Sequence, residues 1–445
     1  MATGYLEHTV GTPGTNGNKK LTFSAWIKRG GIDTEQSFYV TRTDGSNFVR
    51  FRFLDTNYIN ITSNTSGTNY YATTNRLFRD TSAWYHIVIA YDTTQGSSAD
   101  RIKMYVNGTQ ETFSASNYPA QDATLYMLAS GQPQRIGQES GNAYFNGSMT
   151  HVHYTEGHAY AASTFGETDS VSGIWKPKTA PSVTYGTNGF FLKFENGAAM
   201  GTDSSGQSNT FTVNNSVTQN VDTPSNNFAT LNVLASTTSQ NEFQYGNLEH
   251  YGTSNWTGAV TTLGVSSGKY YAEVKVTDRD NFSVGIVTLS GTAINNINTN
   301  NNGKVGKYVD SWGIEGSGSN LSKGNNGSAS SYGSAFTNND IAMIALDVGT
   351  GSNGAVYFGK NGTWFDSGNP ATGSNPAFSS LSFSDAVGFM SGLETGRVQW
   401  NFGQGYFGTT QVASANADAN GHGIFEYAVP SGYYTLNTKN IKEFG

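Results

Sequence analysis

The feature that most constrains this chain is a phrase that occurs twice in it. An apolar strand pattern ends in Asp, passes through a polar loop, resumes as a second strand pattern and closes with Asn-Gly-Thr. The first copy runs from His86 to Thr109 and the second from Ile341 to Thr363. Asn-Gly accepts the two positive φ angles of a type I′ turn, so each copy predicts strand, loop, strand and tight hairpin. The copies are separated by about the length of one large β-sandwich, which predicts two sandwiches in series.

Apolar residues alternate with polar ones in many short segments. In residues 49–54, Val49, Phe51 and Phe53 share one face, while Arg50 and Arg52 point outward. The same period of two occurs in residues 21–28, 270–277 and 398–402, and we see no window with a convincing helical period. The fold class is therefore predicted as all-β, with two antiparallel, jelly-roll type β-sandwiches in tandem.

Composition excludes several classes of protein. Only 13% of the 445 residues are charged, but 26 Phe, 25 Tyr and 7 Trp supply ample material for a core and argue against disorder. The net charge of −7, with no basic stripe, predicts no nucleic-acid partner. The absence of Cys excludes disulfides and thiolate zinc sites. No run is long and apolar enough to predict membrane insertion, and residues 1–5 show no secretion signal.

Shifts in composition suggest domain boundaries. We expect a first sandwich at residues 1–195, with an irregular wrapped connector at about 158–188, then a linker at 196–222 and a second sandwich at 223–445. Residues 295–306 and 316–333 are rich in Asn, Gly and Ser, and we expect them to form long loops at the rim of the second sandwich.

Several of these segments resemble known families. Residues 75–108, with the opening strand at 21–29, resemble a concanavalin A-like (laminin G-like) jelly-roll module. Residues 267–274, 283–286 and 341–362 are similar to a SPRY module. The connector phrases at 165–169, 173–178 and 185–190 resemble those that join such modules in structural proteins of tailed bacteriophages.

The resemblance implies a non-enzymatic protein of the virion surface, in a tail fibre, associated with the tail or attached to the capsid. It would recognise host-surface glycans or other virion proteins through sandwich loops, and would act as a homo-oligomer, with a trimer favoured. Two alternatives stay open, namely a capsid or tail decoration protein with a purely structural role, and a glycan depolymerase.

Aromatic residues in polar loops are the candidate ligand-binding residues. Sugar rings stack on Trp and Tyr, and neutral Asn and Ser add hydrogen bonds. The candidates are Tyr251, Trp256, Trp312 and Trp364. Each could instead belong to the core.

Histidines and rim aspartates invite a metal hypothesis. His151, His153 and Glu156 lie close together in one predicted strand, but we expect a structural role for them. Asp92 and Asp100 bracket one loop and Asp44 lies in another, as calcium ligands could, yet an Asp at a strand end more often makes an Asx turn. We predict no metal and no cofactor.

Catalytic residues are not predicted. His86 follows Trp84-Tyr85, but no Gly-x-Ser-x-Gly elbow occurs to supply a nucleophile. Glycoside hydrolysis needs two nearby carboxylates. Glu167 and Asp169 have a suitable spacing, but they lie in the connector, and Glu273 has no carboxylate partner on its face.

Overall fold

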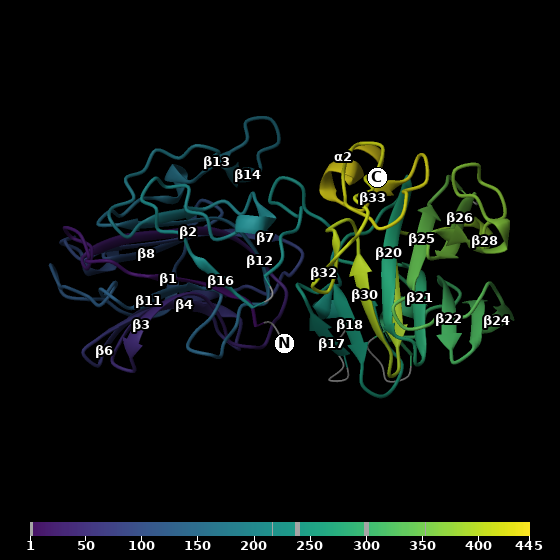
Figure 1. Ribbon diagram of the computed structural model, residues 1–445, viewed down its shortest axis with the longest axis horizontal. Coiled ribbons are helices and arrows are strands. Elements are labelled where there is room, and N and C mark those ends of the chain that lie inside the picture. Colours follow the sequence, from purple (N-terminus) through teal and green to yellow (C-terminus); the bar gives the residue numbers. More distant parts are fainter. Residues whose placement is uncertain (1–2, 216, 236–240, 298–301, 352) are drawn as a thin grey trace. The chain divides into compact units, whose positions relative to one another are not determined.

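The computed structural model describes residues 3–215, 217–235, 241–297, 302–351 and 353–445. The chain divides into two compact units, Met1–Gln219 and Asn220–Gly445 (Figure 1). Both units are built from antiparallel sheets, which confirms the predicted all-β sandwiches. Among the described residues, none of the helices has the length and apolar character needed to cross a membrane.

The first unit packs two sheets face to face. The eight-stranded sheet has the order β10 (Phe113–Asn117), β6 (Thr68–Leu77), β5 (Tyr58–Thr65), β4 (Asn47–Phe53), β3 (Gln36–Asp44), β11 (Pro133–Ile136), β1 (Tyr5–Thr9) and β16 (Thr212–Asn214). The six-stranded sheet has the order β15 (Phe190–Leu192), β12 (Gly147–Glu156), β2 (Lys20–Arg29), β7 (Trp84–Asp92), β8 (Ile102–Val106) and β9 (Thr109–Gln110).

Alternation along these strands builds the core. Phe23 and Ile27 on β2 meet Phe51 and Phe53 on β4, and all four side chains are buried in one cluster. Arg50 and Arg52, which alternate with Val49, Phe51 and Phe53, lie on the opposite face of β4, as the alternation predicts.

Most of the predicted linker, residues 196–222, is folded into the first unit. β16 pairs with β1, and Phe211 just before it is buried in the core of the first unit. Residues 197–199 form a short 3-10 helix, and Asp203 accepts a hydrogen bond from the backbone N–H of Phe191. The polar composition of this segment serves such turns, and the first unit continues to Gln219.

The connector lies on the outer side of the six-stranded sheet. It contains the 3-10 helix at residues 162–164 and a hairpin of β13 (Gly166–Thr168) and β14 (Trp175–Pro177). In Figure 1 this hairpin lies on one side of β2 and β8, and the eight-stranded sheet lies on the other side. The end of the connector is anchored by the buried carboxylate of Glu156, which accepts hydrogen bonds from the backbone N–H groups of Gly14 (2.5 Å) and Asn188 (2.7 Å).

The second unit also has two sheets. One has the order β17 (Asn241–Gln244), β18 (Glu249–Gly252), β30 (Arg397–Asn401), β20 (Lys269–Asp278), β25 (Ile341–Asp347), β26 (Gly354–Lys360) and β27 (Thr363–Trp364), with β28 (Phe378–Leu381) on β26 and β33 (Tyr434–Thr435) parallel to β20. The other has the order β19 (Thr257–Val260), β29 (Val387–Leu393), β21 (Phe282–Thr288), β22 (Ser311–Ser317), β23 (Asn320–Asn325) and β24 (Ser328–Ser331).

The remaining elements of the second unit are short. They are the hairpin of β31 (Tyr406–Phe407) and β32 (Thr410–Gln411), and the helices α1 (Thr292–Asn296) and α2 (Thr438–Phe444).

The two predicted rim loops differ from the expectation. Residues 316–333 are mostly strand, because β22, β23 and β24 run through them as a meander with Asn326-Gly327 at a turn. Residues 295–306 begin in α1, and residues 298–301 lie outside the described part of the chain. The described remainder packs closely on the sheet. Gly392 of β29 leaves the necessary room, because a Cβ atom added there would lie only 2.3 Å from the carbonyl oxygen of Gly303.

The repeated phrase occupies equivalent places in the two units. Asn107 and Gly108 have φ of 50° and 82°, and Asn361 and Gly362 have 49° and 85°, which confirms both tight hairpins. In each, the Asn Oδ1 accepts a 2.8 Å hydrogen bond from the first strand of the phrase, from the N–H of His86 or of Ile341.

The Asp of each copy also has the same neighbour. Lys20 lies opposite Asp92 in the register of β2 and β7, and its Nζ is 3.3 Å from the carboxylate. Lys269 lies opposite Asp347 in the register of β20 and β25, with a distance of 2.9 Å. The four strands β2, β7, β8 and β9 therefore match β20, β25, β26 and β27.

Candidate functional site: the arginine face of the first unit

Three of the four outer sheet faces are covered by irregular segments of the chain. The connector packs Ala162, Phe165 and Trp175 on Val88 of the six-stranded sheet. In the second unit, Phe425 and Tyr427 cover the face of β20 and β25, and Ile297 and Val305 cover the face of β21 and β29. None of the apolar clusters formed by the described residues lies on the outer face of the eight-stranded sheet, which we call the arginine face.

Strand register decides which side chains meet on the arginine face. Tyr71 on β6 lies opposite Thr62 on β5, and Thr62 lies opposite Arg50 on β4. A second row places Thr73 opposite Asn60 and Asn60 opposite Arg52. Directly opposed residues point to the same face, so these six polar side chains form two parallel rows across three strands.

Ion pairs and side-chain hydrogen bonds hold the residues of the arginine face in place. Glu139 Oε1 accepts from Arg50 (3.0 Å) and Arg42 (3.2 Å), and its Oε2 accepts from the hydroxyl of Ser37 (3.1 Å). Arg52 pairs with Glu35. The guanidinium of Arg50 also lies 4.9 Å from the ring centroid of Phe48.

The amides of the face are held in the same way. Asn60 donates to Thr73 Oγ1 (2.9 Å) and accepts from Thr62 Oγ1 (2.9 Å), and Asn64 donates to Asn69 (2.8 Å). These contacts fix the side chains before any ligand arrives, so little conformational entropy would be lost on binding.

The four aromatic candidates from the sequence do not form one site. Trp312 is buried in the core of the second unit, edge-on to Phe383. Trp364 packs on Tyr271 beneath the C-terminal residues. Tyr251 and Trp256 are partly exposed, but a cation lies over each ring: Arg397 is 4.4 Å from the centroid of Tyr251 and Lys304 is 5.2 Å from that of Trp256.

His86 and His153 are parts of the connector's anchorage. Trp175 Nε1 donates to His86 Nδ1 at 2.9 Å, so the proton of this neutral ring is on Nε2, which is 2.9 Å from Ser24 Oγ. Burial, aided by the nearby His151, lowers the pKa of His86 to about 3. A ring in this tautomer donates toward Ser24 and cannot remove its proton, which excludes the pair as a nucleophile and base in this arrangement.

The other histidines of the cluster also pack against the chain. His153 is buried, stacked on Phe191 at 3.9 Å and hydrogen-bonded to the hydroxyl of Tyr185. His151 lies at a β-bulge of β12 with φ of 49°. Across the described residues, we find no group of three or more His, Asp or Glu side chains arranged to hold a metal ion.

The candidate carboxylates are engaged by donors. Asp169 accepts from the backbone and hydroxyl of Ser172 and from Lys176 Nζ, and these bonds hold its pKa well below the usual range. Glu167 shares the same lysine at 3.7 Å. A glycosidase acid needs a raised pKa, so this pair is unsuited to general acid catalysis.

Glu273 does have a raised pKa, but it is fully buried. Burial raises the pKa of Glu273 to about 7, although four hydrogen bonds act to lower it. Their donors are Tyr271, Asn401 and the backbone N–H groups of Glu426 and Tyr427. The carboxyl fastens the C-terminal residues to β20 and faces no solvent.

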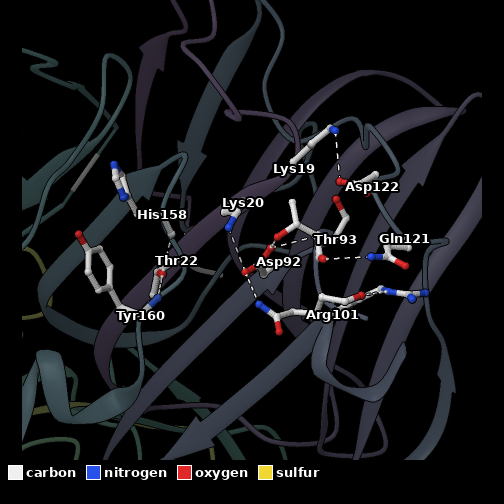
Figure 2. A network of polar contacts seen from close by, with 12 residues as sticks. Lys19, Lys20, Thr22, Asp92, Thr93, Arg101, Gln121, Asp122, His158 and Tyr160 are labelled. Carbon is white, nitrogen blue, oxygen red and sulfur yellow. Dashed lines mark hydrogen bonds and ion pairs between the residues drawn. The ribbon is translucent and has the colours of Figure 1, made fainter. Parts of the chain in front are cut away.

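Two of the three rim aspartates, Asp92 and Asp44, form Asx turns. At the end of β7, Asp92 accepts from the N–H and hydroxyl of Thr94, from Gln95 and from Lys20, and Figure 2 shows the contact between Asp92 and Lys20. The guanidinium of Arg101 donates to the loop carbonyls of Gln95, Gly96 and Pro119 at 2.7–2.9 Å. A side-chain cation thus already engages oxygens that a calcium ion would use.

The other two aspartates are engaged in similar ways. Asp100 pairs with Lys103 at 2.9 Å, and Asp44 accepts from the N–H of Ser46 at 2.7 Å.

Comparison with known proteins finds a family profile similar to part of the first unit. Residues 2–157 match the profile of the concanavalin A-like lectin/glucanases superfamily. The first unit is therefore similar to the domains of this superfamily, whose name covers both lectins and glucanases.

Solved structures with some similarity include two SPRY domains and a pentraxin. The TRIM65 PSpry domain is 14% identical, covers 38% of this chain and 89% of its own, and has a TM-score of 0.28. The human HERC1 SPRY domain is 17% identical, with coverages of 34% and 87% and a TM-score of 0.27. The heptameric SAP-like pentraxin from Limulus polyphemus is 14% identical, with coverages of 41% and 89% and a TM-score of 0.29.

The arginine face was only partly predictable. The alternation in residues 49–54 predicts that Arg50 and Arg52 point outward, and they do. Tyr71, Asn60 and Thr62 belong to other strands, and the sequence does not give the register that brings them beside Arg50.

Proposed function

We propose that the protein is a non-enzymatic glycan-recognition protein whose first unit binds sugar through the arginine face. One observation carries the proposal: this outer sheet face bears a hydrogen-bonded array of Arg, Asn and Thr beside Tyr71, whereas apolar segments cover the other three. Arranged donors and acceptors beside an aromatic ring suit hydroxyl-rich ligands. The domain's superfamily is consistent with carbohydrate binding.

Among the residues that the structure describes, no free carboxylate pair lies on the arginine face, which supports binding over hydrolysis. Glu139, Glu35 and Glu7 are each paired with arginine, at Arg42 and Arg50, Arg52, and Arg135. A carboxylate that already accepts from a guanidinium is not free to protonate a leaving group or to attack a bound sugar, the two roles that hydrolysis requires. A glycan depolymerase is the alternative, and sustained release of reducing ends from a bound polysaccharide would identify one.

We further propose that the protein is displayed on the surface of a tailed-bacteriophage virion, in several copies and in contact with other virion proteins. The support is the resemblance of the connector phrases, above all residues 165–178, to those of phage structural proteins. Several copies would convert weak sugar binding into useful adhesion. Immunogold labelling of intact particles tests this placement. Absence of the protein from purified particles would contradict the proposal.

Glycan-array binding by the full chain tests recognition itself. We expect binding to a subset of surface polysaccharides, weakened by the double variant Arg52→Gln, Asn60→Ala. Arg79→Gln is the matched control, because Arg79 is an exposed arginine in the loop after β6, away from the two rows. Equal binding by the double variant and the control would contradict the proposal, as would failure to bind any glycan.

A further inference from the structure

We infer that the ligand on the arginine face is a neutral sugar, and that one pyranose ring lies over Thr62 between Tyr71 and Arg50. This inference rests on the proposed function. It adds the chemical class of the ligand and the residues that contact it.

Spacing defines the subsite. Tyr71, Thr62 and Arg50 are opposed in register on three adjacent strands. Neighbouring strands are about 4.8 Å apart, so Tyr71 and Arg50 are separated by roughly 10 Å along the row. That length matches one pyranose ring laid across the row above Thr62, which is only 6% exposed, with an aromatic ring at one end and a guanidinium at the other.

Tyr71 is suited to stacking. Its neighbour in sequence, Tyr70, packs against the core, whereas Tyr71 is on the outer face and half-buried. It lies between Thr62 and Asn117 in the register of β5, β6 and β10, so only polar residues flank it across the strands. The C–H face of a sugar would find its apolar partner here.

Each guanidinium of the two rows is already engaged by a carboxylate, which favours a neutral ligand. The carboxylate of Glu139 holds both Arg50 and Arg42, and Glu35 holds Arg52. An anionic sugar would have to compete with these carboxylates for the guanidinium groups. A hydroxyl can instead accept from an arginine and donate to the adjacent carboxylate or to an amide oxygen, leaving each pair intact.

Some polar atoms on the face lack partners. Asn64 Oδ1 and the Nε atoms of Arg50 and Arg52 are buried and make no hydrogen bond. Unsatisfied polar groups are costly, and proteins keep such costs mainly at functional sites. Arg50 Nε belongs to the proposed subsite, and Arg52 Nε and Asn64 Oδ1 lie in the neighbouring rows of the same face.

Titration calorimetry with the full chain tests the inference, using neutral laminarin and mannan against acidic alginate. We expect a neutral glycan to bind with an affinity that changes less than about twofold from 0.05 to 0.5 M salt. Tyr71→Ala should weaken binding by roughly tenfold, and Tyr71→Phe should retain it because stacking needs no hydroxyl. Tyr245→Ala, an exposed tyrosine of the second unit, is the control and should bind normally.

The outcomes separate this inference from the proposed function. Binding of alginate alone, with a steep loss at high salt, would overturn the neutral class while leaving glycan recognition intact. Unchanged binding by Tyr71→Ala would overturn the subsite. If no glycan of any class bound the full chain, both the inference and the proposed function would fail.

Discussion

Trp175 donates its indole N–H to Nδ1 of His86 across 2.9 Å, joining the connector to the strand that opens the first copy of the repeated phrase. Trp175→Phe would leave the buried Nδ1 without a donor. We expect it to lower the free energy of unfolding of the full chain by about 1–3 kcal/mol. Denaturant unfolding followed by fluorescence measures the change. Ile174→Ala, at the exposed neighbour, should shift it by no more than about 0.5 kcal/mol. Equal effects of the two substitutions would contradict the anchoring role.

The hairpin glycine of the first copy packs directly beneath that tryptophan. A Cβ at Gly108 would lie 2.8 Å from the ring of Trp175, whereas a Cβ at Gly327, also at positive φ, would have no atom closer than 3.8 Å. Gly327→Ala should cost about 1 kcal/mol, for backbone strain alone. Gly108→Ala should cost about 2–4 kcal/mol, because the tryptophan must also move. Thermal unfolding of both variants checks this, and equal costs would show that the contact is not tight.

The second unit fastens its covering segment through a carboxylate on β20, whereas the first fastens the connector through His86 on β7. Glu273 on β20 is equivalent in register to Ser24 on β2, and it holds the C-terminal residues through the N–H groups of Glu426 and Tyr427. The two units thus cover matched strands with different chemistry.

Glu273 makes stability depend on pH in a definite direction. Its pKa is raised in the folded state to about 7, so the folded protein binds a proton more tightly than the unfolded chain does. The stabilisation is fully present below the ordinary carboxyl value and is lost as the pH rises through about 7, by up to about 3 kcal/mol. Buried His86 and His250, with pKa values lowered to about 3, act oppositely below pH 6.5.

The difference between the wild-type protein and Glu273→Gln isolates the effect of Glu273. We expect the free energy of unfolding of the wild-type protein to fall relative to the variant from about pH 5 to pH 8. A constant difference across this range, measured in denaturant titrations at each pH, would contradict the raised pKa.

Calcium should not stabilise the first unit, because Lys20 and Arg101 already engage the rim carboxylate and carbonyls. Neither a chelator nor added calcium should change the melting temperature, since only a ligand of the folded state raises it. A rise with calcium that disappears in Asp92→Asn would show that the rim binds the ion.

The sequence predicted the local chemistry of this fold better than its long-range geometry. Positive φ at Asn107 and Gly108 follows from residue type alone, and so does the outward direction of Arg50 and Arg52. The alternation of Trp312 and Ile314 with Ser311 and Gly313 could have indicated a buried tryptophan.

Other features depended on pairings between distant segments. The polar stretch before β16 belongs to the first unit because β16 pairs with β1 and Phe211 enters the core, a contact that composition cannot reveal. Glu139 meets Arg42 and Arg50 only because a distant loop returns to β3 and β4.

Hydrogen–deuterium exchange of the full chain with saturating glycan tests the location of the site most directly. The account predicts slower exchange in peptides from β4, β5 and β6, including Arg50, Thr62 and Tyr71, with the second unit unchanged. Protection confined to the region of Tyr251 and Trp256, or absent from β4 to β6 while the glycan is bound, would contradict the assignment of the arginine face as the binding site.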